Sequence, residues 1–352
     1  MAKKNLAIIF GGRSSEHEVS CISVVTIAKA ASAEKYNLHL IGITKEGNWK
    51  YVDSIETIED GSWVNSEAEA VISPDTKGEL LIITKEQTVS RVRMDVIFPA
   101  LHGMYGEDGT IQGLFEMAKI PYVGCGILAS AASMDKFYTK LIVDTLGIRQ
   151  AQYVPVLKDQ LADMARVVAR VEQTLSYPVF VKPSKAGSSR GVTKAENRAM
   201  LEAGLLEAAK HDYKILVEET IVGRELECAV LGYGDNTKVS GLGEILAAAE
   251  FYDYDAKYNN EESETVIDPV LPDGKTEEIR EDALRIFKTL DGFGLSRVDF
   301  FLEKETNEVV FNEINTLPGF TSISMYPILW GAKGYPIEKL VDTLIDMAVE
   351  RP

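Results

Sequence analysis

The sequence is poor in cysteine, in basic residues and in long apolar segments. Its 352 residues include three cysteines, Cys21, Cys125 and Cys228, which are far apart and lack the spacing of metal ligands. This argues against a disulfide framework and a cysteine-based zinc site, and we expect reduced, buried thiols in a cytoplasmic protein. The 37 Lys and Arg residues face 54 Asp and Glu residues, and the net charge of −17 argues against a nucleic-acid or anionic-membrane partner.

Three kinds of segment are also missing. No run approaches the ~18 apolar residues that a membrane helix needs, and Leu6–Phe10 is too short for a signal peptide. The phosphate-binding pattern GxxxxGKS/T does not occur. The whole sequence has 45% hydrophobic and 26% charged residues, as expected of a soluble globular protein. At roughly 100–200 residues per domain, the chain is long enough for two or three domains.

The first 30 residues predict an α/β opening. A continuous apolar run at 5–10 is followed by Gly11 and Gly12 and then by a segment with helical spacing. This order is typical of a buried parallel strand, a tight turn and a helix. Glu16 falls in the first turn of that helix, where it either compensates the helix dipole or binds an ammonium group.

A second apolar strand at 95–101 ends in His102 and the glycine-rich segment GMYGEDGTIQG. Polar residues at the carboxyl end of such a strand mark the crevice where open α/β sheets bind ligands, so His102 is either functional or a loop-packing residue. Residues 124–129, GCGILA, imitate a dinucleotide-binding turn, with Asp144 at a suitable spacing. Because Asp144 falls inside an expected helix at 131–145, we favour a plain turn and helix start, with an oxidoreductase as the alternative. Residues 45–90 show short strands and no chemistry.

The most informative stretch is RVDFFLEKETNEVVFNEIN, residues 297–315. Its composition predicts two strands, 297–302 and 308–314, joined by a loop at 305–307. A three-residue loop places Asp299 opposite Glu313 and Arg297 opposite Asn315, all on one face of the sheet.

Two carboxylates that face each other need a counter-ion. Oxygen ligands of this kind suit Mg²⁺, which binds through one or two carboxylates together with substrate phosphates. The alternative is a salt-bridge cluster around Arg297. The turn-rich residues 316–322, TLPGFTS, would open this face into a site.

Three further segments suit a nucleotide. Residues 182–192, KPSKAGSSRGV, form a loop of small residues that can bring N–H groups to phosphate oxygens, unless it is a plain surface hairpin. An expected strand at 214–219 ends in two carboxylates and leads into a second strand at 224–230, an arrangement that suits adenine and ribose or a charged sheet edge. Residues 251–258, FYDYDAKY, suit a mobile lid.

Together these segments resemble the D-alanine–D-alanine ligases of the ATP-grasp superfamily over almost the whole chain. The resemblance is carried, in family order, by GGRSSEHEVS, LHGMYGEDGTIQG, SMDKFYTK, VKPSKAGSSRG, VEETIVGRELE, FYDYDAKY, SRVDFFLE and FNEINTLPGFTSISMYP. It implies an α/β ATP-grasp fold with an N-terminal open α/β (pre-ATP-grasp) domain. The implied domains are 1–123, 124–217 and 218–352, with the nucleotide between the second and third.

The resemblance also implies a set of ATP contacts. Lys136 and Lys182 match the lysines that hold the phosphates, beside Gly187 and Ser189 of the glycine-rich loop. The remaining contacts are Glu218, Glu219 and the backbone near Ile221 for adenine, and Glu225 for ribose. Glu219 stands where other members carry Lys, at a position that offers mainly backbone and stem contacts.

The metal and substrate residues follow from the same resemblance. Asp299, Glu313 and Asn315 match the ligands of two Mg²⁺ ions, which Mn²⁺ could replace. Glu16 matches the partner of the first D-alanine's ammonium group, linked through Ser188 and Tyr258 to the lid. The remaining matches are Arg297 and the Gly319 amide for the oxyanion, and Lys257 and Ser324 for the carboxylate of the second substrate.

The implied activity is the ATP-dependent ligation of two D-alanine molecules through an acylphosphate, for peptidoglycan precursors, by a cytoplasmic homodimer without nucleic-acid or membrane partners. The alternatives are a D-alanine–D-serine or D-alanine–D-lactate ligase and a non-catalytic nucleotide-binding regulator. Tyr258 favours D-alanine, because the lactate-type ligases that the chain resembles lack this tyrosine. The intact Arg297, Asp299, Glu313 and Asn315 argue against a regulator.

Overall fold

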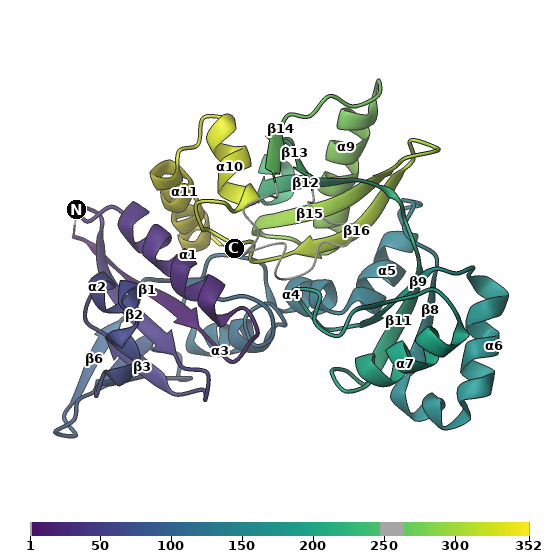
Figure 1. Cartoon of the computed structure of the whole chain (residues 1–352). Coiled ribbons are helices and arrows are strands. Elements are labelled where there is room, and N and C mark those ends of the chain that lie inside the picture. The colour runs from purple at the N-terminus through teal and green to yellow at the C-terminus, as the bar shows by residue number, and fades with distance from the viewer. Residues whose placement is uncertain (1, 247–263, 352) are drawn as a thin grey trace.

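The structure is a computed structural model that describes residues 2–246 and 264–351. Within these residues the strands form three sheets, which follow one another along the chain (Figure 1). The expected lid, with Lys257 and Tyr258, lies outside the described residues. No helix in the described part of the chain is long and apolar enough to cross a membrane.

The first sheet has the strand order β6–β5–β4–β3–β2–β1–β7, and β1 pairs in parallel with both β2 and β7. Its strands are β1 Lys4–Gly11, β2 Tyr36–Ile43, β3 Trp49–Val52, β4 Glu69–Ile72, β5 Glu79–Ile83, β6 Val89–Arg93 and β7 Val96–Ala100. The helical segments of this region are α1 His17–Ala30, α2 Ile55–Glu59, η1 Ser62–Asn65 and α3 Thr110–Ala118. Residues 45–90 thus supply β3, β4, β5 and the first residues of β6.

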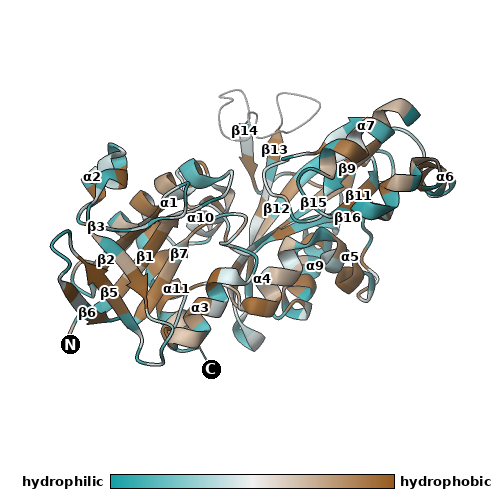
Figure 2. Ribbon diagram, turned by 90° about the horizontal axis from the view of Figure 1, so that it is seen from below, coloured by the Kyte–Doolittle hydropathy of each residue, from teal (hydrophilic) through white to brown (hydrophobic). Residues whose placement is uncertain are grey.

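The predicted opening is confirmed, and its continuous apolar run has a physical reason. Leu6, Ile8 and Phe10 enter one core cluster, while Ala7 and Ile9 enter another on the opposite face of β1. A parallel strand covered on both faces needs apolar residues at every position rather than at alternate ones. Figure 2 shows the central strands of this sheet in the hydrophobic colour and the surrounding turns in the hydrophilic one.

The expected single helix at 131–145 is wrong, because the chain forms two helices, α4 Ile127–Met134 and α5 Lys136–Asp144. The break lies at Asp135, whose φ of −90° and ψ of 96° are extended. Its buried carboxylate accepts hydrogen bonds from Ser184 Oγ at 2.6 Å and from Lys214 Nζ at 2.8 Å. These contacts with the second sheet hold Asp135 out of the helix, and local periodicity does not reveal them.

The second sheet has the order β10–β9–β11–β8. Its elements are β8 Tyr153–Leu157, η2 Lys158–Asp163, α6 Met164–Thr174, β9 Val179–Pro183, β10 Thr193–Ala195, α7 Arg198–Ala208 and β11 Lys214–Glu219. The predicted strand at 214–219 is confirmed to the residue. The helical segment between β8 and β9 begins as 3-10 turns at Lys158 and becomes α-helical only at Met164.

The third sheet has the order β14–β13–β12–β15–β16 among the described strands. Its elements are β12 Gly223–Gly232, η3 Gly234–Asn236, β13 Lys238–Leu246, β14 Glu264–Ile267, α9 Lys275–Thr289, β15 Gly294–Glu303, β16 Val309–Asn315, α10 Met325–Ala332 and α11 Ile337–Val349. One core cluster unites Phe10 of the first sheet, Leu295 of the third and Leu344 of α11. The C-terminal helices therefore join the first sheet to the third (Figure 1).

The three cysteines are free thiols. Cys125 and Cys228 are buried as expected, whereas Cys21 is only partly buried.

Candidate active site

The hairpin of β15 and β16 pairs as the sequence predicts at the positions that matter. Arg297 lies opposite Asn315, and Asp299 lies opposite Glu313. The neighbouring strand β12 adds a third acid, because Glu227 lies opposite Asp299 on the other side. A row of three carboxylates thus crosses three adjacent strands.

Two departures from the predicted hairpin together produce this pairing. The loop is one residue longer than expected, since Glu303 N–H donates to the Glu308 carbonyl and residues 304–307 form the turn. A bulge then shifts the register, so that Phe300 pairs with Phe311 and Asn312 is the extra residue. Without that bulge, Glu313 would fall on the apolar face of the sheet. The longer loop and the bulge offset each other.

Arg297 lies at the centre of the acid row with 7% of its surface exposed. Its Nε and Nη2 donate to the two carboxylate oxygens of Asp299 at 2.8 and 2.7 Å, and Nε lies 3.0 Å from Glu227 Oε2. Although desolvation alone would lower it, the carboxylates of Asp299 and Glu227 raise the pKa of Arg297 well above its ordinary value. The guanidinium is therefore a fixed positive charge on this face.

Asn315 adds a hydrogen bond within the row, and Glu313 contacts a lysine that also contacts the glycine-rich loop. Asn315 Nδ2 donates to Asp299 Oδ2 at 2.9 Å. Lys136, at the start of α5, lies 3.1 Å from Glu313 Oε2 and donates to the Ala186 carbonyl at 3.0 Å. Burial would lower the pKa of Lys136, but the Glu313 carboxylate raises it. Lys136 thus links the hairpin to the glycine-rich loop.

A second buried cluster lies on the other side of the same cavity. Glu218 on β11 is 5% exposed, and its two oxygens contact different lysines. Lys140 Nζ lies 3.2 Å from Oε1, and Lys182 Nζ lies 2.5 Å from Oε2. Burial would raise the pKa of Glu218, but the ammonium groups of Lys140 and Lys182 lower it. This cluster carries two cations and one anion.

The cavity between the two clusters has a volume of about 640 Å³. It includes many of the sequence-predicted site residues, namely Lys136, Lys182, Ser188, Ser189, Glu218, Glu219, Ile221, Glu225, Arg297, Asp299 and Glu313. Phe180, Leu226, Phe300 and Phe311 supply apolar wall. Such a mixture suits a flat apolar base with a charged tail.

Glu16 approaches the cavity from the first sheet. A Cβ atom added to Gly103 would lie 2.7 Å from Glu16 Oε2, and one added to Gly187 would lie 2.9 Å from the same atom. The carboxylate is therefore packed between two glycines, which only residues without a side chain permit. Beside it, Ser188 has a φ of +50° and a buried Oγ without a hydrogen-bond partner among the described atoms.

The loop after β16 is held by the first sheet. Glu107 accepts the Leu317 N–H at 2.8 Å and the Gly103 N–H at 2.8 Å, and His102 Nδ1 contacts the Leu317 carbonyl at 2.9 Å. Ser23 Oγ accepts the Phe320 N–H at 3.2 Å. Burial, together with the nearby charge of Glu16, raises the pKa of Glu107 to about 7. These contacts fix the backbone on both sides of Gly319.

Gly319 and Ser324 lie side by side in that loop. A Cβ atom on Gly319 would lie 2.6 Å from Ser324 Oγ, so a larger residue would displace the hydroxyl. Ser324 Oγ also accepts the Thr321 N–H at 3.0 Å. These two residues are outside the cavity lining, and so are Glu16, Gly187 and Asn315.

Sequence reasoning missed three participants. Glu107 lies in the glycine-rich segment after β7, Lys140 lies on an amphipathic helix, and Glu227 alternates with Glu225 on β12. Glu227 offered a signal, since alternation places Glu225 and Glu227 on one face, and Glu107 lies in the segment that the sequence marks as a crevice. The Leu317 partner of Glu107 and the Glu218 partner of Lys140 are distant in sequence.

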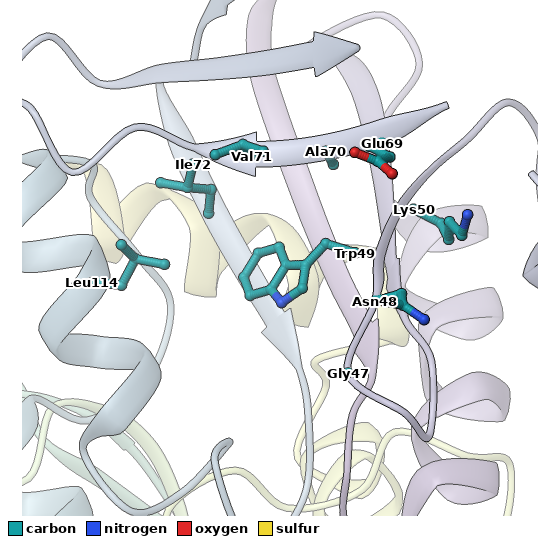
Figure 3. A pocket seen from close by; sticks show the side chains of 9 residues that line it. All are labelled: Gly47, Asn48, Trp49, Lys50, Glu69, Ala70, Val71, Ile72 and Leu114. Atoms are coloured by element: carbon teal, nitrogen blue, oxygen red, sulfur yellow. The ribbon is translucent and has the colours of Figure 1, made fainter. Parts of the chain in front are cut away.

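A second cavity, of about 670 Å³, lies in the first sheet and contains none of the predicted site residues. It forms where β3 and β4, which pair only at Lys50 and Glu69, diverge. Figure 3 shows Trp49 projecting between the two strands with Leu114 of α3 beside the opening. This second cavity is therefore not part of the predicted site.

Comparison with known proteins agrees with this geometry. The family model for the D-ala D-ala ligase N-terminus matches residues 5–125, and that for the D-ala D-ala ligase C-terminus matches residues 142–346. The D-alanine--D-alanine ligase of Ruminiclostridium cellulolyticum is 51% identical and covers 100% of this chain and 96% of its own length. The D-alanine--D-alanine ligase of Acetivibrio thermocellus is 49% identical, and the match covers 99% of this chain and 96% of that protein.

Two solved structures are similar over their full lengths. The VanG D-Ala:D-Ser ligase from Enterococcus faecalis has a TM-score of 0.88 at 37% identity, covering 99% of this chain and 100% of that one. The D-alanine-D-alanine ligase from Coxiella burnetii has a TM-score of 0.85 at 32% identity, covering 100% and 95%. The chain therefore belongs to the D-alanine–D-alanine ligase family and has its ATP-grasp fold.

Proposed function

We propose that the chain joins two D-alanine molecules to form D-alanyl-D-alanine, a peptidoglycan precursor, and converts ATP to ADP and phosphate. The observation that carries the proposal is the single cavity between two buried charge clusters. Its lining includes Lys136 and Lys182, to which we assign the phosphates, together with Asp299 and Glu313. An ATP-dependent ligase needs this combination, because it must hold a triphosphate and then stabilise an oxyanion.

In the first step, a carboxylate oxygen of one D-alanine attacks the γ-phosphorus of ATP, and the bond to the β-phosphate oxygen breaks. The products are an acylphosphate and ADP. Lys182 and Lys136 hold the phosphates, and Gly187 and Ser189 approach them from the glycine-rich loop. Glu16 binds the ammonium group of this D-alanine and fixes its carboxylate for attack. Ser188 and Tyr258 connect this contact to the lid.

The metal-binding residues suit Mg²⁺. No group of three or more His, Cys, Asp and Glu residues able to hold a metal occurs in residues 2–246 and 264–351. The face instead offers Asp299, Glu313 and the amide oxygen of Asn315, a set that suits an ion completed by substrate phosphates. Mg²⁺, or Mn²⁺, would supply charge neutralisation of the phosphate oxygens when bound.

In the second step, the amine of the other D-alanine attacks the acyl carbon, and phosphate leaves as the tetrahedral intermediate collapses. The departing phosphate takes up the proton that the amine loses, and the new amide bond forms. Arg297 and the Gly319 N–H stabilise the oxyanion. Arg297 needs little reorganisation, because Asp299 and Glu227 already hold its guanidinium in place. Lys257 and Ser324 bind the second carboxylate.

The adenine and ribose contacts complete the ATP site. Glu218, Glu219 and the backbone of Ile221 bind adenine, and Glu225 binds the ribose hydroxyls. We propose that the three sheets form three domains, at 1–123, 124–217 and 218–352. The protein acts as a cytoplasmic homodimer.

A second candidate is a ligase that takes D-serine at the second position. It is favoured by the TM-score of 0.88 to the VanG D-Ala:D-Ser ligase. The higher identities, 51% and 49%, belong to relatives named for D-alanine at both positions. The second amino acid therefore has to be varied in the assay.

The test is phosphate release from ATP with D-alanine, L-alanine, D-serine, D-lactate or no acceptor. We expect ADP and phosphate in equal amounts with D-alanine and background release with L-alanine. Faster turnover when D-serine is added to D-alanine would transfer the assignment to the second candidate. Background release in every mixture would overturn the ligase function.

A further inference from the structure

Lys140 is a buried cation to which the proposed mechanism gives no part. It lies on α5 with 2% of its surface exposed. Its ammonium group contacts Glu218 Oε1 at 3.2 Å and donates to the Ala151 carbonyl at 3.3 Å, and it lies 5.1 Å from the centre of the Tyr153 ring. A lysine is rarely buried so completely unless its charge is needed by a partner.

The two lysines around Glu218 differ in position. Lys182 lies on β9, next to the glycine-rich loop, with 13% of its side chain exposed, whereas the Lys140 side chain is 3% exposed. The lysines also contact different oxygens of Glu218. Only Lys182 belongs to the proposed phosphate site, so its ammonium group can leave Oε2 while Lys140 keeps Oε1.

We propose that Lys140 is a positioning residue that anchors Glu218 Oε1, so that Oε2 can pass from Lys182 to the exocyclic amino group of adenine. This inference rests on the proposed function, in which Lys182 binds the phosphates of ATP. With Lys140 in place, Glu218 stays ionised after Lys182 turns to the triphosphate. An ionised carboxylate only accepts hydrogen bonds.

Purine selectivity follows from that restriction. The amino group of adenine donates to the carboxylate, whereas guanine places a carbonyl oxygen at the same position, and two acceptors repel each other. Without Lys140, Glu218 would be a buried and unpaired charge once Lys182 has moved. It would take up a proton instead, and a protonated carboxyl group can donate to the guanine oxygen. Lys140 thus acts through Glu218 on the choice of base.

The test compares ATP with GTP in two variants, Lys140→Met, which keeps length without charge, and Lys140→Arg, which keeps the charge. Binding of each nucleotide is measured by calorimetry without amino acid, and kcat/KM is measured with D-alanine. We expect Lys140→Met to reduce the ATP-to-GTP ratio by about 10-fold or more, since a hydrogen bond to a charged group is lost. Lys140→Arg retains most of the ratio.

Lys194 supplies a matched control, because it lines the same cavity from β10. Lys194→Met removes one positive charge from the cavity, and we expect it to weaken ATP and GTP equally. A Lys140→Met enzyme that folds and keeps the wild-type ratio would overturn the inference. So would an equal change of the ratio in Lys194→Met.

If Lys140→Met does not fold, the double variant Lys140→Met/Glu218→Gln removes both charges. The dependence of the ATP-to-GTP ratio on this pair can then be measured in the double variant. We expect it to fold and to discriminate poorly between the nucleotides, whereas a wild-type ratio would contradict the inference. A wild-type protein that binds neither nucleotide would instead overturn the proposed function itself.

Discussion

The two buried charge clusters that face each other across the cavity have opposite balances. On the hairpin side, three carboxylates, Glu227, Asp299 and Glu313, surround the cations Arg297 and Lys136. On the side of the second sheet, Lys140 and Lys182 share the single carboxylate of Glu218. One face has a surplus of negative charge and the other a surplus of positive charge.

That difference explains how a chain with a net charge of −17 can bind a triphosphate. In a site of low effective dielectric, the local balance of charge matters more than the distant surface. In the site that we propose, the positive cluster would attract phosphate oxygens, and the negative row would attract a metal ion that accompanies them. Each wall of the cavity thus has a charge opposite to that of the ligand group it would bind.

The largest expected effect comes from removing the cation inside the negative row. Arg297→Ala leaves Asp299 and Glu227 without their shared partner, and we expect a loss of about 3–5 kcal/mol of stability. Turnover should also fall by about 10²–10³, because the oxyanion loses a donor. Nucleotide affinity should change little. Thermal unfolding, steady-state kinetics and ADP binding measure these three quantities.

Arg297→Lys serves as the control, since it keeps the charge but not the paired hydrogen bonds. It should be more stable than Arg297→Ala and still slow. Wild-type turnover in Arg297→Ala would refute the oxyanion role.

Glu107 sharpens the comparison, because it is a carboxylate held mainly by N–H groups rather than by a cation. Its pKa of about 7 lies above the ordinary 4.5. A raised pKa stabilises the fold below pH 4.5, and this contribution is lost as the pH rises through 7. Relative to Glu107→Gln, we expect the free energy of unfolding of the wild type to fall by about 3 kcal/mol as the pH rises from below 4.5 to above 7. Denaturant unfolding of both proteins at pH 5 and 8 tests this, and parallel profiles would contradict it.

A smaller effect is expected at the edge of the negative row. Glu313→Gln removes a charged ligand and the partner of Lys136, so half-maximal activity should require about 10–100-fold more Mg²⁺. A titration of activity with Mg²⁺ at saturating ATP measures the shift. An unchanged titration would return the hairpin to a salt-bridge cluster without a metal role.

The smallest effect is expected outside both clusters, where Arg149 contacts Glu219, Glu303 and Glu308 at 3.9, 3.1 and 3.1 Å. This side chain is 34% exposed, and such ion pairs contribute up to about 1 kcal/mol. Arg149→Met should therefore lower stability only slightly and leave kinetics unchanged. A loss as large as that of Arg297→Ala would show that exposure does not separate the two kinds of charge cluster.

Sequence reasoning predicted one wall of the cavity better than the other. The pairs of Arg297 with Asn315 and of Asp299 with Glu313 were predicted, although the four-residue turn and the bulge at Asn312 that produce them were not. Lys140 could not be recognised, because a lysine on an amphipathic helix looks the same whether it is solvated or buried. Its partner Glu218 is 78 positions away, so only tertiary structure reveals the pair.

The same limit applies to the contacts between the segment that follows β7 and the loop after β16. His102 and Glu107 lie in a segment that the sequence marks as a crevice, but their contacts with Leu317 span more than 200 positions. Asp135 likewise breaks a helix through contacts with distant residues. Local patterns predicted the strands, whereas long-range polar contacts decided the details.

The bulge at Asn312 has a consequence for how the hairpin can vary. It acts as a register correction placed between the turn and the acid row. An insertion or deletion within 304–307 would alter the tip of the hairpin and leave Asp299 facing Glu313. Loss of the bulge would instead turn Glu313 and Asn315 toward the apolar layer beneath α9. The length of the turn and the pairing of the acid row are therefore separable, and loop engineering at this tip can proceed without rebuilding the row.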